Sequence, residues 1–179
     1  MRKLKTEELD RLSVAEFKAS KKTPIIVVLD NIRSMNNIGS VFRTCDAFRI
    51  ESIILTGITA QPPHRDINKT ALGATETVDW QYIDSIEKAV IQLKEEAYTT
   101  IAIEQVADSV SLNTYTPNQE GRYALIFGNE VNGVTEEAMA LVDLSLEIPQ
   151  IGNKHSLNIS VCAGIVLWDL AEKLKVFPT

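Results

Sequence analysis

Short apolar runs that alternate with segments of helical spacing are the feature that most constrains how this 179-residue chain can fold. Residues 25–29 are continuously apolar and mostly β-branched, which is typical of a strand covered on both faces of a parallel sheet. Similar strands are predicted at residues 52–57, 78–83, 99–103, 123–127 and 144–148. Helices are predicted at residues 4–20, 40–48, 85–97, 136–142 and 157–170. Strands that alternate with helices predict an α/β fold in which a mostly parallel sheet is sandwiched by helices.

The connections around these elements are polar and differ in length. Residues 30–39 are predicted to form a polar turn, and residues 58–72 a long loop with basic and ring side chains. The loop before the last helix contains glycine and a cation, and Ser156 is expected to cap that helix. The helix itself is apolar nearly all round, so we expect it to be buried against several elements. It is too short to span a bilayer, and it contains Asp169.

Charge and cysteine content narrow the class of protein. The net charge is −6, which argues against a chain coated in cations for nucleic acid. Residues 1–22 nevertheless hold seven Lys or Arg against four acidic residues, which leaves −9 on the remainder. We therefore expect a basic helical extension over residues 1–22 and one domain over residues 23–179, although a solvated helix face also explains the basic start. Cys45 and Cys162 form no CxxC motif and no leader opens the chain, so we expect a cytoplasmic protein.

Four polar stretches stand at the carboxyl ends of predicted strands, where open α/β sheets place ligands. They are residues 36–43, 103–104, 128–134 and 152–158. A single Asn-Gly pair is usually just a turn, but several stretches converging on one edge indicate a binding site. The sequence has no GxGxxG after the first strand and no phosphate-binding GxxxxGK. His64 and His155 are too few and too far apart to form a ligand set with the cysteines, so no metal site is predicted.

Three of these stretches together resemble the motifs of a known enzyme family. Asn37-x-Gly39-x-x-x-Arg43, residues 127–133 (Phe-Gly-Asn-Glu-Val-Asn-Gly) and residues 148–160 (Ile-Pro-x-x-Gly-x-x-x-Ser-Leu-Asn-x-Ser) are similar to motifs 1, 2 and 3 of the SpoU/TrmH family of SPOUT RNA 2′-O-ribose methyltransferases. The resemblance implies a C-terminal deep trefoil knot, S-adenosylmethionine held by the knot loops, and a homodimer formed through the knot region. It also implies methylation of a ribose 2′-hydroxyl in a structured RNA. Because no separate RNA-binding domain precedes the motifs, we expect tRNA, with rRNA as the alternative.

The resemblance also assigns roles to individual residues. The catalytic group comprises Asn37, Arg43, Glu130, Ser156 and Asn158. Cofactor contacts are expected at Glu104, Gly128, Asn129, Ile148, Gly152 and Leu157. We further expect RNA contacts at Arg11, Lys18, Arg33, His64, Arg65, Lys69 and Lys154. A guanidinium hardly loses its proton near neutral pH, so we expect Arg43 to hold a phosphate and to stabilise the developing alkoxide.

Two other functions compete with this interpretation. A module that binds the cofactor or RNA without catalysis would have the same fold, but the catalytic group is intact. An ordinary doubly wound nucleotide-binding protein would need a phosphate loop, which the sequence lacks. The expected partners are therefore RNA and a second copy of the chain, with no membrane and no metal.

Overall fold

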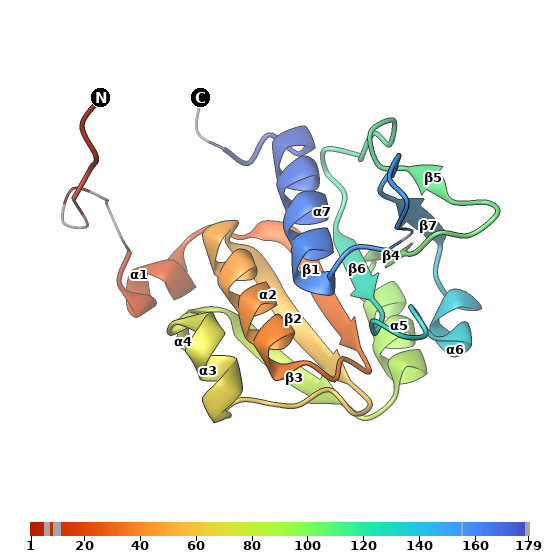
Figure 1. Cartoon of the computed structure of the whole chain (residues 1–179), viewed down its shortest axis with the longest axis horizontal. Helices are drawn as coiled ribbons and strands as arrows, with labels where there is room; N and C mark the ends of the chain where they lie inside the picture. The colour runs from red at the N-terminus through yellow and green to blue at the C-terminus, as the bar shows by residue number, and fades with distance from the viewer. Residues whose placement is uncertain (6–7, 9–11, 155, 178–179) are drawn as a thin grey trace.

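Among the residues that the structure describes, seven parallel strands form a single sheet in the spatial order β3-β2-β1-β6-β4-β7-β5 (Figure 1). This computed structural model describes residues 1–5, 8, 12–154 and 156–177. The strands are β1 (Thr23–Asp30), β2 (Ile50–Thr56), β3 (Asp79–Ile83), β4 (Thr99–Ile103), β5 (Val110–Ser111), β6 (Tyr123–Phe127) and β7 (Leu144–Glu147). The expected parallel sheet is confirmed. The sequence did not reveal β5, because a two-residue strand carries no periodicity.

Helices cover both faces of the sheet, as expected. They are α1 (Val14–Ala19), α2 (Met35–Ala47), α3 (Arg65–Ala71), α4 (Ala74–Thr77), α5 (Ile86–Glu95), α6 (Glu136–Met139) and α7 (Ile159–Lys173). One apolar core lies between the sheet and helices α1 to α4 and α7, and a second lies between the sheet and helices α5 and α6. Figure 1 shows α2 and α7 side by side over the first of these faces.

The side chains of β1 explain why this strand stands near the middle of the sheet. Ile25, Val27 and Leu29 belong to the first core, and Ile26 and Val28 belong to the second. All five are buried, at 5% exposure or less. Burying each such side chain contributes about 1.5–3 kcal/mol. The apolar run therefore places the polar residues that follow it at the carboxyl edge of the sheet.

Helix α2 begins five residues before the start predicted from its apolar spacing. The hydroxyl of Ser34 accepts a hydrogen bond from the main-chain N–H of Asn37 at 3.3 Å and caps the helix. The polar turn predicted at residues 30–39 is therefore wrong beyond Ser34, because the cap allows polar residues to form the first turn. As a result, Asn37 and Gly39 are helical residues.

The long loop predicted at residues 58–72 contains a helix, α3. It begins after His64, whose Nδ1 accepts a hydrogen bond from the main-chain N–H of Asp66 at 3.2 Å. Helix α3 packs on α2 at Gly39, where a Cβ atom would lie 2.2 Å from the carbonyl oxygen of Ile67. Only glycine permits this approach, so Gly39 sets the position of α3.

The N-terminal extension contains a helix, α1, within its described residues. The hydroxyl of Ser13 accepts from the main-chain N–H of Glu16 at 3.3 Å, and the Glu16 carboxylate accepts from the main-chain N–H of Ser13 at 2.8 Å. This is a capping box. Phe17 anchors α1 in the first core with 5% exposure. The helix predicted at residues 4–20 is confirmed only over α1 and is wrong at residues 4–5 and 12–13, which are not helical. Arg11 lies outside the described residues.

The C-terminal helix α7 is buried on one side only. Its cap is Asn158 and not Ser156, because Oδ1 of Asn158 accepts from the main-chain N–H of Ser160 at 2.9 Å. The other side leaves Val161 and Trp168 each 51% exposed. The expectation that the chain encloses this helix is therefore wrong for one face, which is apolar and open. No helix among the described residues is long and apolar enough to cross a membrane.

Candidate functional site

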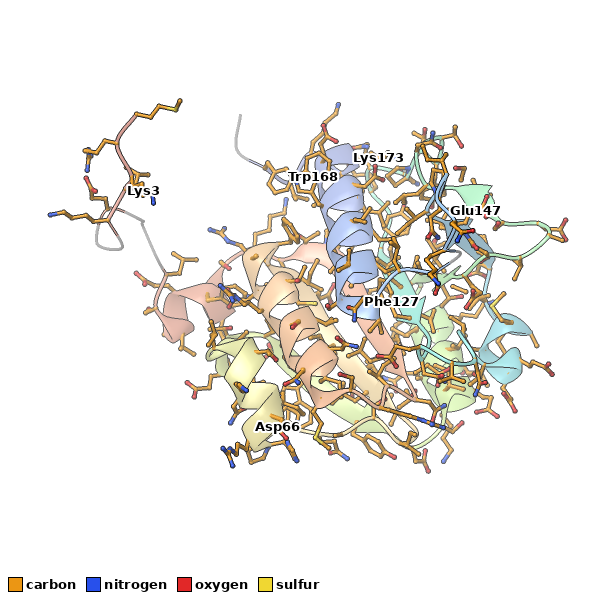
Figure 2. The ribbon with its side chains drawn as sticks, viewed as in Figure 1. Lys3, Asp66, Phe127, Glu147, Trp168 and Lys173 are labelled. Atoms are coloured by element: carbon orange, nitrogen blue, oxygen red, sulfur yellow. The ribbon has the colours of Figure 1, made fainter. Side chains whose placement is uncertain are left out.

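A cavity of about 560 Å³ opens at the carboxyl ends of β4, β6 and β7, beside the start of α7. Figure 2 shows Phe127, the last residue of β6, next to this end of the helix. The apolar walls come from Ile103, Phe127, Leu146, Ile148, Leu157 and Ile159. The polar lining includes Glu104, Gln105, Asn129, Glu130, Asn132, Gln150, Ser156 and Asn158. The volume is within the range of about 300–1,000 Å³ that small-molecule sites occupy. Three of the four polar stretches therefore meet in one place.

The loop over residues 128–134 is held in shape by an asparagine of its own. Asn129 and Gly133 exchange two main-chain hydrogen bonds, with N···O distances of 3.1 and 2.9 Å. The side-chain Oδ1 of Asn129 accepts from the main-chain N–H groups of Val131 and Asn132, both at 2.9 Å. The side chain is buried, at 7% exposure. Asn129 therefore stabilises the conformation of the loop that lines the cavity.

Two glycines allow this loop to pack closely, and Glu104 forms hydrogen bonds with the main chain in and beside it. A Cβ atom at Gly128 would lie 1.9 Å from the carbonyl carbon of Gly133. Gly133 has a φ of +68°, and a Cβ atom there would lie 2.1 Å from Oε2 of Glu104. That oxygen accepts from the main-chain N–H of Val134 at 3.0 Å, and Oε1 accepts from the main-chain N–H of Gln105 at 3.1 Å. The carboxylate of Glu104 therefore braces the loop.

Asp30 is a buried carboxylate beside the site that the sequence analysis missed. It ends β1 and is 0% exposed. Its Oδ2 accepts from the main-chain N–H and the hydroxyl of Thr135 at 3.2 and 2.8 Å. Its Oδ1 accepts from Nδ2 of Asn31 at 2.8 Å and from the hydroxyl of Thr56 at 3.3 Å. Asp30 therefore ties the exit of the 128–134 loop to β1 and β2. The available signal was a carboxylate directly after an apolar run, where a buried charge needs several donors.

A chain of side-chain hydrogen bonds joins the three motifs. Nδ2 of Asn37 donates to Oε1 of Glu130 at 2.6 Å, and Oδ1 of Asn37 accepts from Nδ2 of Asn158 at 3.2 Å. Oδ1 of Asn158 accepts from the main-chain N–H and the hydroxyl of Ser160 at 2.9 and 2.7 Å. Because a carboxylate only accepts hydrogen bonds, Glu130 determines the orientation of both amides. Motif 1 on α2, motif 2 after β6 and motif 3 at the start of α7 are thus linked directly.

Replacing Asn37 by aspartate is expected to destabilise the protein by about 0.5 kcal/mol more than replacing it by serine, because repulsion from the exposed Glu130 carboxylate outweighs the gain from an acid in the first turn of α2. Aspartate has the shape of asparagine but cannot donate to Glu130, and it sets a second carboxylate against the first. Thermal unfolding of the two variants measures the difference. High salt should reduce it, because this hydrogen bond is exposed to solvent. Equal stability of the two variants at low salt would contradict the role given to this bond.

The residues expected to act in catalysis do not all reach the cavity. Glu130, Ser156 and Asn158 line it, and Asn37 contacts two of them. Arg43 is exposed and lies outside the lining, and its side chain has no ion pair or hydrogen bond with any residue that the structure describes. Six positions along α2 separate it from Asn37, roughly 9 Å of helical rise. Arg43 is therefore open to a large substrate and not to a ligand inside the cavity.

Most residues expected to contact a cofactor are brought together. Those that line the cavity are Glu104, Gly128, Asn129, Ile148 and Leu157. Gly152 lies outside the lining, and a Cβ atom there would meet nothing within 4 Å. The geometry therefore gives no support to a contact at Gly152.

The cations expected to contact RNA are spread over several elements. The exposed ones among the described residues are Lys18, Arg33, Arg65, Lys69 and Lys154. Arg33 follows β1 and Lys154 precedes α7, so both stand at the edge of the sheet that carries the cavity. His64 caps α3. Lys18 pairs with Asp79 at 3.4 Å, an exposed ion pair that contributes little stability.

The cysteines are free thiols, and the described residues contain no group of three His, Cys, Asp or Glu close enough to hold a metal ion. Burial raises the pKa of the Cys45 thiol. Burial, with a smaller contribution from Glu104, raises the pKa of Cys162 to about 11. Both thiols are protonated at neutral pH, so neither is an activated nucleophile.

Comparison of the sequence with known proteins identifies one family. The family model described as the SpoU rRNA Methylase family matches residues 24–168. A 23S rRNA (guanosine-2′-O-)-methyltransferase RlmB of Vibrio parahaemolyticus is 26% identical over 167 residues, which cover 93% of this chain and 66% of the relative. A tRNA (guanosine(18)-2′-O)-methyltransferase of Thermus thermophilus is 30% identical over 165 residues, which cover 90% of this chain and 81% of the relative. The chain thus spans about two thirds of the length of the rRNA relative.

Solved structures share the arrangement of the sheet and helices. A TrmH/SpoU tRNA modifying enzyme from A. aeolicus has a TM-score of 0.80 at 22% identity, with 91% of this chain and 83% of that chain covered. An AdoMet-bound rRNA methyltransferase from Sinorhizobium meliloti has a TM-score of 0.77 at 24% identity, with 91% and 61% covered. The parallel sheet with helices on both faces is therefore an arrangement already seen in enzymes that act on RNA.

Proposed function

Because the chain belongs to the SpoU rRNA methylase family, we propose that it transfers a methyl group from S-adenosylmethionine to a ribose 2′-hydroxyl of RNA. The observation that carries this proposal is the hydrogen-bonded chain from Glu130 through Asn37 to Asn158 at the rim of a cofactor-sized cavity. Both relatives compared above are named as 2′-O-methyltransferases, which supports the same reaction class.

The cavity suits S-adenosylmethionine, which has a flat aromatic adenine and a charged methionine part. Leu146, Ile148 and Leu157 offer apolar surface to the adenine. Main-chain groups of the 128–134 loop and the side chain of Gln150 offer polar contacts to the remainder. When bound, the cofactor supplies an electrophilic methyl group on a sulfonium. A lining that is polar and apolar in similar measure suits a molecule with both an aromatic and a charged part.

The residues of the chain would position the ribose and handle charge at its 2′-oxygen. Glu130 and Asn158 line the cavity, and Asn37 holds both in one orientation, so little reorganisation is needed when the substrate arrives. Arg43 would hold the phosphate beside the reacting ribose and stabilise the developing alkoxide with its planar cation. The O–C bond forms as the S–C bond breaks, and the products are the 2′-O-methyl ribose, S-adenosylhomocysteine and a proton released to solvent.

The proposed substrate is a structured RNA, with tRNA favoured over rRNA. The exposed cations that would contact its phosphates are Arg33, Arg65, Lys69 and Lys154. Residues 1–22 would add a basic extension to a methyltransferase domain over residues 23–179, whose C-terminal segment would form the trefoil knot. The two free cysteines suit the reducing cytoplasm.

Incubation with labelled S-adenosylmethionine and total RNA, followed by mapping of the labelled nucleotide, tests the reaction. We expect label on a ribose, which makes the adjoining phosphodiester resistant to alkali. Label on a base would contradict the proposal. Binding of both cofactor and RNA without transfer would indicate a module that lacks catalysis.

A cofactor in this cavity should protect Cys162 from alkylation. The thiol lines the cavity and has a pKa of about 11, so its reaction with iodoacetamide should be slow near neutral pH and should accelerate as the pH rises toward that value. At mildly alkaline pH, saturating S-adenosylhomocysteine should slow the reaction, which intact-mass measurement follows. The variant Cys162→Ser identifies the adduct, because Cys45 is buried. Unchanged labelling with the cofactor bound would place the cofactor elsewhere.

We also propose that the exposed apolar face of α7 forms a homodimer interface. Val161, Ile165 and Trp168 are 51%, 39% and 51% exposed on this face, and Gly164 lies between them in sequence. Contiguous exposed apolar side chains mark an interaction surface. A Cβ atom at Gly164 meets nothing within 4 Å, so Gly164→Ala should stabilise a protomer by about 0.5–1 kcal/mol yet weaken a dimer packed against it. Sedimentation and unfolding measure both effects, and a monomeric wild-type protein at micromolar concentration would refute the interface.

A further inference from the structure

A second cavity lies at the opposite edge of the sheet from the proposed active site. Its volume is about 850 Å³, and it opens where β1 and β6 begin and where α2 and α7 end. The two cavities lie near opposite ends of α7. Figure 2 shows this helix with Phe127 beside one end and Lys173 at the other. The charged residues of the lining are Lys21, Lys22, Arg49, Arg122, Lys175 and Glu120. In a chain with a net charge of −6, this is a local excess of positive charge.

Two of these five cations already have partners inside the protein. The ammonium of Lys22 donates to the carbonyl oxygen of Phe17 and lies 3.6 Å from the centre of its ring. Arg122 forms an ion pair with Glu51 at 3.0 Å. Within the described ranges, the side chains of Lys21, Arg49 and Lys175 have no ion pair and no hydrogen bond. Three cations are therefore left to face a ligand.

Arg49 and Lys175 occupy backbone conformations that their residue types rarely adopt. Arg49 follows the cap of α2 with a φ of 49°, and Lys175 follows the cap of α7 with a φ of 55°. Glycine or asparagine usually fills this place after a helix, because a larger side chain is strained there. Leu72 and Ala97 take the same conformation at the ends of α3 and α5, so the conformation alone assigns no role to the charge. It places both cations at the mouth of this one cavity.

The helix ends at this cavity have partial negative charge, which repels an anion. The C-termini of α2 and α7 each carry about half a negative charge, so together they offset about one cation. Glu120 and Glu51 offset two more. Asp46 and Asp79 also act on Lys22, and Lys18 adds one more cation there. Six cations against four carboxylates and the two helix ends leave a balance of about +1, which still attracts a polyanion.

The wall of the cavity also has an aromatic part. The rings of Phe48 and Phe177 pack edge to face with their centres 6.1 Å apart, and both residues line the cavity. Phe177 is 39% exposed. Exposed aromatic rings beside cations are the combination that binds nucleic acid, since bases stack on the rings and phosphates meet the cations.

We propose that this cavity binds the phosphate backbone of the RNA substrate, as a docking site apart from the place of methyl transfer. The inference rests on the proposed function. Strand β1 runs from this cavity to the other edge and has eight residues, which span roughly 26 Å at about 3.3 Å each. A mononucleotide cannot reach both edges, whereas a folded RNA can, so the docking site would favour large RNA over fragments.

The variants Arg49→Asn and Lys175→Asn, made singly and together, test the proposal. Asparagine tolerates a positive φ, so these changes remove charge without adding backbone strain. We expect the double variant to bind bulk tRNA about tenfold more weakly at moderate salt, with a plot of log K against log salt that is shallower by about 0.7–0.9 per lost contact. Cofactor binding, thermal unfolding and turnover at saturating RNA should match the wild type. The control Lys88→Asn, which removes an exposed cation of α5, should leave RNA affinity unchanged.

The outcomes of these measurements test the docking site and the methyl transfer separately. An unchanged salt slope in the double variant, or an equal loss in Lys88→Asn, would overturn the docking site. A second contrary result would come from calorimetry with inorganic phosphate. If the two substitutions abolished phosphate binding but left RNA affinity unchanged, the ligand of the cavity would be a small anion and not RNA. A wild-type protein that binds no RNA would overturn it as well. Binding of tRNA with the expected salt dependence but no methyl transfer would overturn the proposed function and leave the docking site standing.

Discussion

Replacing Arg43 by alanine is expected to lower methyl transfer by about 10² or more while S-adenosylmethionine still binds. Arg43 is exposed on α2 and lies outside the cavity lining, so its removal changes nothing around the cofactor. Its guanidinium would hold an RNA phosphate and stabilise charge on the ribose oxygen, an interaction that is strongest in the transition state. Turnover at saturating RNA and calorimetric titration with cofactor measure the two effects separately.

The variant Arg43→Lys should recover little of this activity, because a point charge on a flexible stem cannot reproduce a planar fork at a phosphate. Neither variant should change the free energy of unfolding by more than about 0.5 kcal/mol, since the side chain has no polar partner in the described part of the chain. Near-normal turnover by Arg43→Ala would remove the arginine from the mechanism. A loss of stability that parallels the loss of activity would mean that Arg43 supports α2 instead.

Replacing Gly128 by alanine is expected to weaken cofactor binding by about tenfold to hundredfold and to destabilise the fold by about 1–3 kcal/mol. The added methyl group would lie 1.9 Å from the carbonyl carbon of Gly133 and 2.0 Å from the main-chain nitrogen of Val134. Main-chain atoms cannot rotate away as a side chain can. The loop must therefore shift, which disturbs the bonds between Asn129 and Gly133 and the bond from Val134 to Glu104.

The matched control for this variant is Gly152→Ala, in the other loop beside the cavity. A Cβ atom at Gly152 meets nothing within 4 Å, and the residue does not line the cavity. This variant should bind S-adenosylmethionine as the wild type does. Calorimetry and thermal unfolding of the two variants make the comparison. Unchanged binding in a folded Gly128→Ala protein would show that the 128–134 loop does not shape the cofactor site, and a loss in Gly152→Ala would restore Gly152 to it.

The strands other than β5 and the three motifs can be predicted from sequence because their signals are local. A run such as residues 25–29 is apolar on both faces wherever it sits, and the spacing of Asn37, Gly39 and Arg43 is visible without any structure. The helix α3 is different. Its segment has polar residues and two prolines before it, and the helix is held by packing on Gly39, so local pattern alone predicts a loop.

The bonds that shape the site join residues far apart in the chain. Asn37 and Glu130 are 93 positions apart, Asn158 and Asn37 are 121 apart, and Asp30 and Thr135 are 105 apart. No periodicity reports such pairs, because only the sheet order brings them together. The exposed face of α7 could not be predicted from sequence for a related reason. An apolar residue in a sequence does not indicate whether it packs in the core of its own chain or against another chain.

Strand β6 is central in the sheet but late in the chain. It stands between β1 and β4, and it begins only at Tyr123. During synthesis, β1 can pair with β2 at once, but its other edge stays unpaired until β6 leaves the ribosome. A nascent chain would therefore expose a row of free main-chain donors and acceptors for most of its translation time, as an aggregation-prone edge does. We expect a slow, cooperative final folding step in which β6 closes the sheet, and a dependence on chaperones until then.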